Sequence, residues 1–327
     1  MNRSIDNAGT TPEGLVSHRL AMGATSAPAD HSIQKYSQSA MATAYELFLQ
    51  HDEAAYAEQA ATACFALLQE IEQELSRFLP GSDLSAIAQL RSGEQMVLGP
   101  HTFACLTTAQ NIAAETGGAF DVAYLSRNAE TGREQAPAEG PLFSLDDQSR
   151  VLLSHTDHLL LDLGGIGKGY ALDCMAGTLR EWEVSRALLQ GGRSSLLALA
   201  PPTGAAGWAL TISHPNRDVG QLAEITLENL AMGASGIMKG AHISIPHGAD
   251  GPGNIFIRAT WSLGPSAAEM DALSTAAMLV PETELVDLCQ RLNCSVARLV
   301  SSPVEAGPGD EDQLLLYGAQ RDLFVPL

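Results

Sequence analysis

The chain has 327 residues, enough to bury a substantial core in one large domain or in two modest ones. Its 18 Lys and Arg residues against 38 Asp and Glu residues give a net charge of −20, and the basic residues form no cluster. Such a field repels nucleic-acid backbones and anionic lipids, so we expect no nucleic-acid partner. No apolar run approaches the roughly 18 residues of a spanning helix, so we expect no membrane insertion.

The five cysteines are spaced without a C-x-x-C pair and lie mostly among apolar or small residues. This pattern favours free thiols in a reducing compartment. No apolar signal-peptide segment precedes residue 40, and no lipobox-like junction precedes a cysteine near the start. The sequence as given therefore predicts a cytoplasmic protein.

The N-terminal part is predicted to hold an arm, a strand and a long helix. Residues 1–38 are rich in Ser, Thr, Ala, Gly and Pro without a sustained period, which favours a flexible arm. Residues 45–49 predict the first strand, shortly after Met41. Residues 52–78 carry apolar side chains at helical spacing, so we expect one long helix.

A second helix is predicted over about 101–116, because the pair Gly117-Gly118 that follows it is a natural C-cap. The tripeptide A-F-D comes directly after this pair. Residues 126–150 are polar and contain several Gly and Pro residues, so we expect an exposed insertion there.

The centre of the chain holds the pattern around which the rest is organised. The apolar run 159–161, closed by Asp162, predicts a buried strand. The glycine-rich sequence L-G-G-I-G-K-G follows, and helical spacing begins at Tyr170. Strand, glycine turn and helix start together favour an anion site, because amides of the first helical turn point at a bound phosphate. Lys168 adds a positive charge, and Asp162 can accept from a base or a ribose hydroxyl. The alternative is a tight connection without a ligand.

This loop is neither a P-loop nor a Rossmann loop. A P-loop needs glycine where Asp162 stands, and a Rossmann loop needs a third glycine where Tyr170 stands. It is therefore a nucleotide-type loop of another kind.

The C-terminal half predicts mostly strands, followed by helices and a tail. Further elements are expected as strands within 186–199, at 208–213, 225–227, 230–232 and 254–261, a helix at 282–293, and strands near 295–300 and 314–317.

Asp271 and Thr275 lie in a predicted helix, M-D-A-L-S-T-A-A-M-L, and are four residues apart. Their side chains therefore share one face. A carboxylate and a hydroxyl on one face form half a site for Mg²⁺, which keeps waters and takes further ligands from substrate phosphate. The alternative is a helix N-cap with a back-bonded threonine.

Taken in order, these segments resemble the ApbE family, the FAD:protein FMN transferases. The loop D-L-G-G-I-G-K-G-Y-A is similar to the family's D-L-G-G-I-A-K-G-Y-A, and D-A-L-S-T-A is nearly identical to its A-D-A-L-S-T-A-L. The sequences A-M-A-T, S-R-F-L-P-G-S-D-L-S and G-G-A-F-D corroborate the resemblance, which covers roughly residues 38–300.

The resemblance implies an α+β fold, a duplicated T-fold of antiparallel sheets and packed helices with FAD in a cleft between the halves. On this basis the chain divides into an arm (1–38), an FAD-binding transferase domain (39–302) and a C-terminal tail (303–327). Many family members are exported, whereas we expect this chain to be cytoplasmic.

The resemblance also implies a reaction and its residues. FAD would be cleaved with Mg²⁺, FMN would pass to a threonine of a partner flavoprotein, and AMP would leave. The metal would be held by Asp271, Thr275 and a backbone carbonyl at Gly165, and His242 would position a phosphate or take the acceptor's proton. Residues implied to contact FAD are Met41, Phe78, Ala119, Phe120, Asp121, Asp162, Lys168 and Ile243.

Three acidic positions of the family are lost in this chain, at Arg193, Ile237 and Ile245. We therefore keep three alternatives: an FAD pyrophosphatase that releases FMN and AMP, a catalytically weakened FAD-binding protein of the same family, and an unrelated dinucleotide oxidoreductase.

Overall fold

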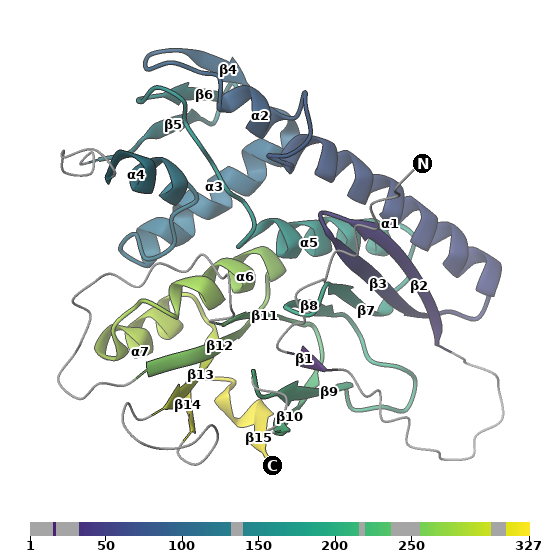
Figure 1. The fold of residues 1–327 in the computed structure, drawn as a ribbon. Helices are drawn as coiled ribbons and strands as arrows, with labels where there is room; N and C mark the ends of the chain where they lie inside the picture. Colours follow the sequence, from purple (N-terminus) through teal and green to yellow (C-terminus); the bar gives the residue numbers. More distant parts are fainter. Residues whose placement is uncertain (1–15, 18–32, 132–139, 216–219, 237–255, 302–311) are drawn as a thin grey trace, which may run out of the picture.

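Two antiparallel sheets and a layer of helices form most of the protein (Figure 1). The structure, a computed structural model, describes residues 16–17, 33–131, 140–215, 220–236, 256–301 and 312–327. Within these ranges the central layer is an eight-stranded sheet in the order β14-β13-β12-β11-β8-β7-β3-β2. Its strands are β2 (Gln34–Ala40), β3 (Thr43–Gln50), β7 (Arg186–Gly191), β8 (Ser195–Ala198), β11 (Leu230–Gly236), β12 (Phe256–Gly264), β13 (Ser295–Ser301) and β14 (Gln313–Gly318).

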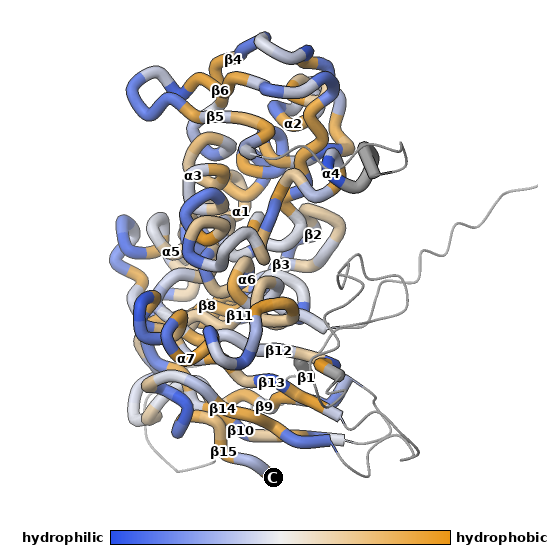
Figure 2. The backbone as a smooth tube through the Cα atoms, turned by 90° about the vertical axis from the view of Figure 1, so that its left-hand side faces the viewer, coloured by the Kyte–Doolittle hydropathy of each residue, from blue (hydrophilic) through white to orange (hydrophobic). Residues whose placement is uncertain are grey.

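A second sheet packs on one face of the central sheet. Its order is β1-β9-β10-β15, with β1 (Val16–Ser17), β9 (Trp208–Ser213), β10 (Gln221–Leu227) and β15 (Phe324–Pro326). Because side chains alternate along a strand, Phe48 and Leu188 enter the core between the sheets, whereas Leu47 and Leu189 enter the core under the helices. Orange predominates along the strands of this sandwich in Figure 2. Strands β8 and β13 are buried along their whole length, whereas β10 alternates between buried and exposed residues.

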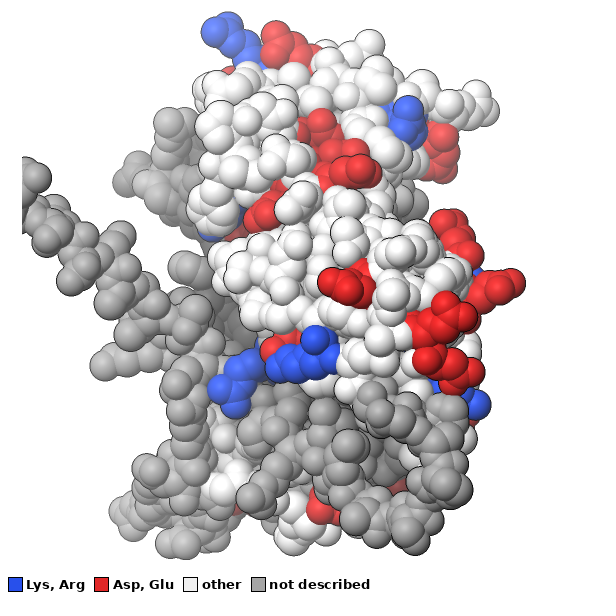
Figure 3. Space-filling model, turned by 90° about the vertical axis from the view of Figure 1, so that its right-hand side faces the viewer, with Lys and Arg blue, Asp and Glu red and all other residues white. Residues whose placement is uncertain are grey.

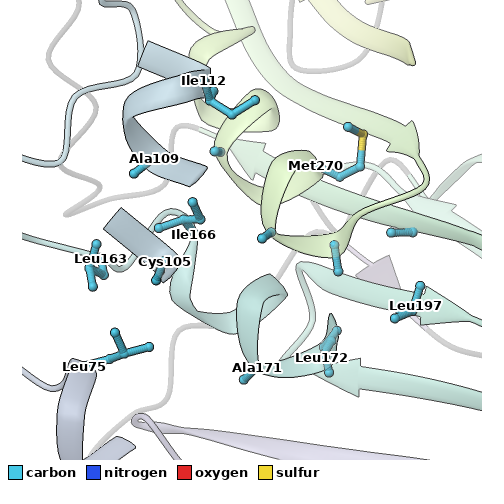
Figure 4. Packing of buried hydrophobic residues seen from close by; sticks show 14 of the residues in the cluster. Leu75, Cys105, Ala109, Ile112, Leu163, Ile166, Ala171, Leu172, Leu197 and Met270 are labelled. Carbon is cyan, nitrogen blue, oxygen red and sulfur yellow. The ribbon is translucent and has the colours of Figure 1, made fainter. Parts of the chain in front are cut away.

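Helices cover the other face of the central sheet. The long helix α1 (Ala54–Leu75) packs on α5 (Gly167–Glu181), α3 (Pro100–Glu115) packs on α6 (Ala267–Ala276), and α5 and α6 pack on each other. Leu163 and Ile166 lie beside Cys105 of α3, so the start of α5 is anchored in this core (Figure 4). The arrangement is the predicted α+β class.

Smaller elements complete the fold. A three-stranded sheet in the order β4-β6-β5 lies beyond α3 in Figure 1, and helix α7 packs on β14. These elements are β4 (Gln95–Val97), β5 (Phe143–Asp146), β6 (Val151–Ser154), α2 (Asp83–Ile87), α4 (Tyr124–Thr131), α7 (Glu282–Arg291) and the 3₁₀ turn η1 (Arg321–Leu323). Among the helices of the described ranges, none has the length and apolar character needed to cross a bilayer.

The predicted strand at 159–161 is wrong. Leu159 and Leu161 are buried, but no strand in the described ranges pairs with this run. Its backbone is instead bonded to the segment before and within α4, because Asp162 donates its N–H to the carbonyl of Val122 at 2.8 Å and Leu160 donates to the Ser126 hydroxyl at 2.7 Å. The apolar run therefore indicated burial here, not sheet pairing.

Two predicted irregular segments contain strands. Strand β5 lies inside the expected insertion at 126–150 and pairs with β6. Strand β2 lies at the end of the expected arm and pairs with β3 over its whole length. Both pairings are made by backbone groups, so the polar composition of these segments did not reveal them.

Candidate active site

A cavity of about 700 Å³ lies where the helical layer meets the end of β11. Segments that are far apart in the sequence line it: the turn after α3 with Gly118, Ala119, Phe120 and Asp121; the start of α4 with Tyr124 and Arg127; the glycine loop with Asp162, Gly164, Gly165 and Lys168; the end of β11 with Ala234, Ser235 and Gly236; and α6 with Asp271, Ser274 and Thr275, followed by Leu279.

Asp162 organises the glycine loop at the cavity wall. Its Oδ1 accepts from the backbone N–H of Gly164 at 2.8 Å, and its Oδ2 accepts from the Tyr124 hydroxyl at 3.1 Å. The Arg77 guanidinium Nε lies 3.6 Å from the same Oδ2. Burial, with the neighbouring Asp162 charge, raises the pKa of Tyr124 to about 12, so the phenol stays a donor. The Asp162 carboxylate is therefore held in one orientation.

The first turn of α5 is less open to an anion than the sequence predicted. The N–H of Gly167 is bonded to the carbonyl of Leu163 at 2.7 Å, and the N–H of Gly169 is bonded to Oδ2 of Asp271 at 2.8 Å. Lys168 does lie at the cavity, with its Nζ 3.2 Å from the carbonyl oxygen of Gly164 and 4.0 Å from Asp271 Oδ2. Lys168 is thus the clearer candidate for holding a phosphate.

Asp271 is a buried carboxylate at the cavity floor. Its Oδ2 accepts from the Gly169 N–H and from the Ser195 hydroxyl, each at 2.8 Å. Among the described residues no donor contacts its Oδ1. Burial raises the pKa of Asp271 to about 6, while Lys168 and the two hydrogen bonds oppose that rise. The group is therefore a costly buried charge with one oxygen open to a ligand.

Thr275 lies one helical turn after Asp271 and faces the same cavity. Its hydroxyl is 3.1 Å from the Ser235 hydroxyl and 3.5 Å from the carbonyl of Asp271. A methyl group placed on Gly165 would lie 3.3 Å from Thr275 Oγ1 and 3.2 Å from the Phe120 ring, so the loop backbone passes directly over both. The three residues predicted to hold a metal are thus brought together.

The chemistry of this set fits Mg²⁺. A carboxylate, a hydroxyl and a nearby backbone segment offer hard oxygen ligands, and Mg²⁺ usually keeps several waters beside one or two carboxylates and substrate phosphates. Among the described residues no three His, Cys, Asp or Glu side chains form a metal cluster. The described side chains alone therefore do not complete a metal coordination shell.

The turn after α3 supplies the part of the cavity wall beside the glycine loop. Gly117 and Gly118 have positive φ of 60° and 85°, conformations that favour glycine and end the helix as predicted. Phe120 is buried, and Oδ2 of Asp121 accepts from Nε of Arg127 at 2.6 Å. Each carboxylate of the cavity thus has a basic side chain beside it: Arg127 beside Asp121, Arg77 beside Asp162 and Lys168 beside Asp271. On one outer face of the molecule, by contrast, acidic side chains are more frequent than basic ones (Figure 3).

Two residues predicted to contact FAD lie outside the cavity lining. Met41, with φ of 50°, sits behind the loop, where its sulfur accepts from the Tyr45 hydroxyl at 3.2 Å and its methyl faces Gly167. Phe78 is 76% exposed, with the Arg77 guanidinium 4.3 Å from the ring centroid. His242 and Ile243 lie outside the described residues.

The structure also adds residues that sequence reasoning missed. Tyr124 and Arg127 reach the cavity from α4, Arg77 pairs with Asp162, and Ser195 binds Asp271 from β8. The position of Tyr124 and Arg127, shortly after Asp121 in the sequence, offered a signal. Arg77 stands in the motif S-R-F-L-P-G-S-D-L-S, directly before Phe78, whereas Ser195 is brought to Asp271 by packing alone.

Comparison with known proteins finds one matching family and several similar structures. The sequence model of the ApbE family matches residues 41–299. The fold is similar to the flavin transferase ApbE of Vibrio cholerae, with a TM-score of 0.73 and 20% identity over 89% of this chain and 99% of that chain. It is also similar to the flavinyl transferase ApbE of Pseudomonas stutzeri in its apo form, with a TM-score of 0.72 and 21% identity over 90% of this chain and 97% of that chain.

A third similar structure is the ApbE protein of Thermotoga maritima, with a TM-score of 0.69 and 19% identity over 85% of this chain and 97% of that chain. No curated protein matches the sequence. The structural likenesses establish the fold, and the family match covers the whole cavity lining, from the turn after α3 to α6.

Proposed function

This chain belongs to the ApbE family, and from that premise we propose that it is a Mg²⁺-dependent flavin transferase. It cleaves the pyrophosphate of FAD, attaches FMN to a threonine of a partner flavoprotein and releases AMP. The names of the similar Vibrio and Pseudomonas structures support the class of reaction. The single observation that carries the proposal is the convergence of Asp271, Thr275 and Gly165 on one cavity beside Lys168.

Two groups of residues act on the pyrophosphate, the metal ligands and Lys168. Asp271, Thr275 and the Gly165 carbonyl would hold Mg²⁺, and the bound ion would supply positive charge that stabilises negative charge on phosphoryl oxygens. Lys168, paired at 4.0 Å with Asp271, adds a second positive charge at the same wall. Both act where negative charge develops, and preorganised charges of this kind usually contribute most to phosphoryl transfer.

The nucleotide is held by the glycine loop and the turn after α3, which lie side by side in the cavity wall. Asp162, fixed by Gly164 and Tyr124, accepts from a ribose hydroxyl or a base. Phe120 and Asp121 form the part of the cavity wall beside the glycine loop, where a methyl group on Gly165 would lie 3.2 Å from the Phe120 ring. His242 would position a phosphate or take the acceptor's proton, and its role rests on the family resemblance alone.

The test combines the protein with FAD, MgCl₂ and a candidate acceptor flavoprotein. We expect AMP to appear by chromatography and fluorescent flavin to stay on the acceptor through a denaturing gel. Chelation by EDTA should stop both, and replacing the acceptor's target threonine with alanine should stop the labelling. Absence of AMP with every acceptor would contradict the proposal.

A second candidate function rests on the lost acidic positions at Arg193, Ile237 and Ile245. The same assay without an acceptor separates the possibilities. Release of FMN and AMP without an acceptor identifies a pyrophosphatase, whereas bound FAD that stays intact with Mg²⁺ both without and with an acceptor identifies an FAD-binding protein that has lost turnover.

A further inference from the structure

Asp173, which takes no part in the cavity lining, caps the helix that carries the metal half-site. It lies in α5, and its Oδ1 accepts from the N–H of Ala267 at 2.9 Å. Its Oδ2 accepts from the N–H of Ala268 at 2.9 Å and from the hydroxyl of Ser266 at 2.8 Å. These donors are the N-cap residue and the first two residues of α6. Asp173 therefore satisfies the amides that begin α6.

The capping is reciprocal. Asp271 of α6 accepts from the N–H of Gly169, which lies in the first turn of α5. Each helix thus receives a carboxylate from the other at its N-terminus, where the helix dipole favours negative charge. Gly169 makes this approach possible, because a side-chain carbon there would overlap the backbone carbonyl of Ala267.

Helix α6 is also pressed against the central sheet. A side-chain carbon on Gly233 of β11 would overlap the backbone carbonyl of Met270, so strand and helix meet backbone to backbone. The contact with β11 thus limits movement of α6 toward the sheet. The hydrogen bonds to Asp173 fix the N-terminus of α6 against α5. We call these reciprocal bonds between Asp173, Asp271 and the two helix starts the α5–α6 clasp.

We propose that Asp173 is a positioning residue for the metal half-site, an inference that rests on the proposed function. The half-site is divided between the two helices: Gly165 precedes the start of α5, while Asp271 and Thr275 lie on α6. The α5–α6 clasp sets the distance between these two parts. Since Mg²⁺ demands near-ideal octahedral geometry, a small displacement of α6 costs metal affinity before it costs the fold.

The test compares Asp173→Asn with Glu74→Gln. Glu74 of α1 is a matched control, because its Oε2 accepts from the N–H groups of His101 and Thr102 and so caps α3, which carries no proposed metal ligand. Metal binding is measured on the FAD-free protein with Mn²⁺, which takes the same oxygen ligands, by the loss of the free-Mn²⁺ EPR signal. The half-saturating MgCl₂ concentration for AMP release gives a second readout, and urea unfolding gives the stability of each variant.

We expect Asp173→Asn to weaken Mn²⁺ binding and to raise the half-saturating MgCl₂ concentration by about 10–100-fold, the usual effect of removing a partner that orients a metal ligand. Saturating MgCl₂ should restore most of the turnover. Glu74→Gln should lose stability without either shift. If Asp173→Asn does not fold, Ser266→Ala removes one bond of the α5–α6 clasp and should shift Mn²⁺ binding in the same direction by less.

Three outcomes would overturn the inference. Wild-type metal binding that Asp173→Asn leaves unchanged would refute the positioning role and leave the proposed function standing. An equal shift in Glu74→Gln would show that metal affinity follows general stability. A wild-type protein that neither binds Mn²⁺ nor responds to MgCl₂ would refute the metal site itself, and the inference with it.

Discussion

Replacing Asp271 with Asn should stabilise the metal-free protein while it removes Mg²⁺-dependent turnover. The carboxylate is buried, and burial raises its pKa from 3.8 to about 6. At about 1.4 kcal/mol for each pKa unit, keeping the charged form in the folded state costs roughly 3 kcal/mol at neutral pH. Asparagine carries no charge, and its single side-chain oxygen can still accept from Gly169 or Ser195.

The expected gain is smaller than this cost, because the asparagine oxygen replaces a charged acceptor of two hydrogen bonds. We expect the free energy of unfolding to rise by ~1–2 kcal/mol and the melting temperature by a few degrees. Scanning calorimetry in EDTA measures this change. Asp147→Asn, which neutralises an exposed carboxylate, is the control and should change stability by less than about 0.5 kcal/mol.

The gain should depend on pH in a defined direction. Since the pKa of Asp271 is higher in the folded protein than the ordinary value, the folded state takes up a proton first as the pH falls. The cost of the charge is therefore full above about pH 7 and disappears below about pH 4. The difference in melting temperature between wild type and Asp271→Asn should shrink across this window.

Two results would refute this reasoning. An Asp271→Asn protein that is less stable than wild type at pH 8 in EDTA would show that the hydrogen bonds to Oδ2 outweigh the cost of burial. A variant that keeps full Mg²⁺-stimulated AMP release would show that Asp271 is not a metal ligand.

Three further predictions concern the ligand, the helix contact and the lost acidic positions. We expect FAD to bind in preference to NAD or ATP with millimolar Mg²⁺ present; equal affinities in a flavin-fluorescence competition would contradict the family function. Gly169→Ala should lower stability by more than about 3 kcal/mol in urea unfolding, because the added methyl group overlaps the Ala267 carbonyl. Gly177→Ala, in the same helix and with no described atom within 4 Å, should be neutral or stabilising by up to about 1 kcal/mol, and a similar loss in both variants would argue against the α5–α6 contact. Ile245→Asp should raise the rate of FMN transfer without tightening FAD binding, and a fast wild-type transfer would show that this carboxylate is dispensable.

Much of the fold follows from local pattern. Side-chain alternation along β3 and the helical spacing of α1 are set by the period of each element, so the sequence predicted both elements nearly in place. The glycine loop, the G-G-A-F-D turn and the D-A-L-S-T helix are contiguous motifs, and their resemblance to one family was enough to predict the family itself, which the sequence model confirms.

Tertiary contacts decided what local pattern could not. The run 159–161 is short and apolar like a buried strand, yet no strand of the described residues pairs with it. The amide of Leu160 is bonded to the Ser126 hydroxyl, and the amide of Asp162 is bonded to the carbonyl of Val122. The Gly169 amide is a second example. At an isolated helix start this N–H would be free to bind an anion, but in this fold it is hydrogen-bonded to the carboxylate of Asp271.

The site itself depends on both levels. The sequence alone determined which residue types could hold a metal, since Asp271 and Thr275 share a helix face by their spacing. Only the structure decided that Gly165 lies over Thr275 and that Asp173 caps α6, because these contacts join residues about a hundred positions apart. Their distances are set by how the two helices pack on each other and on the central sheet, which no spacing within one segment encodes.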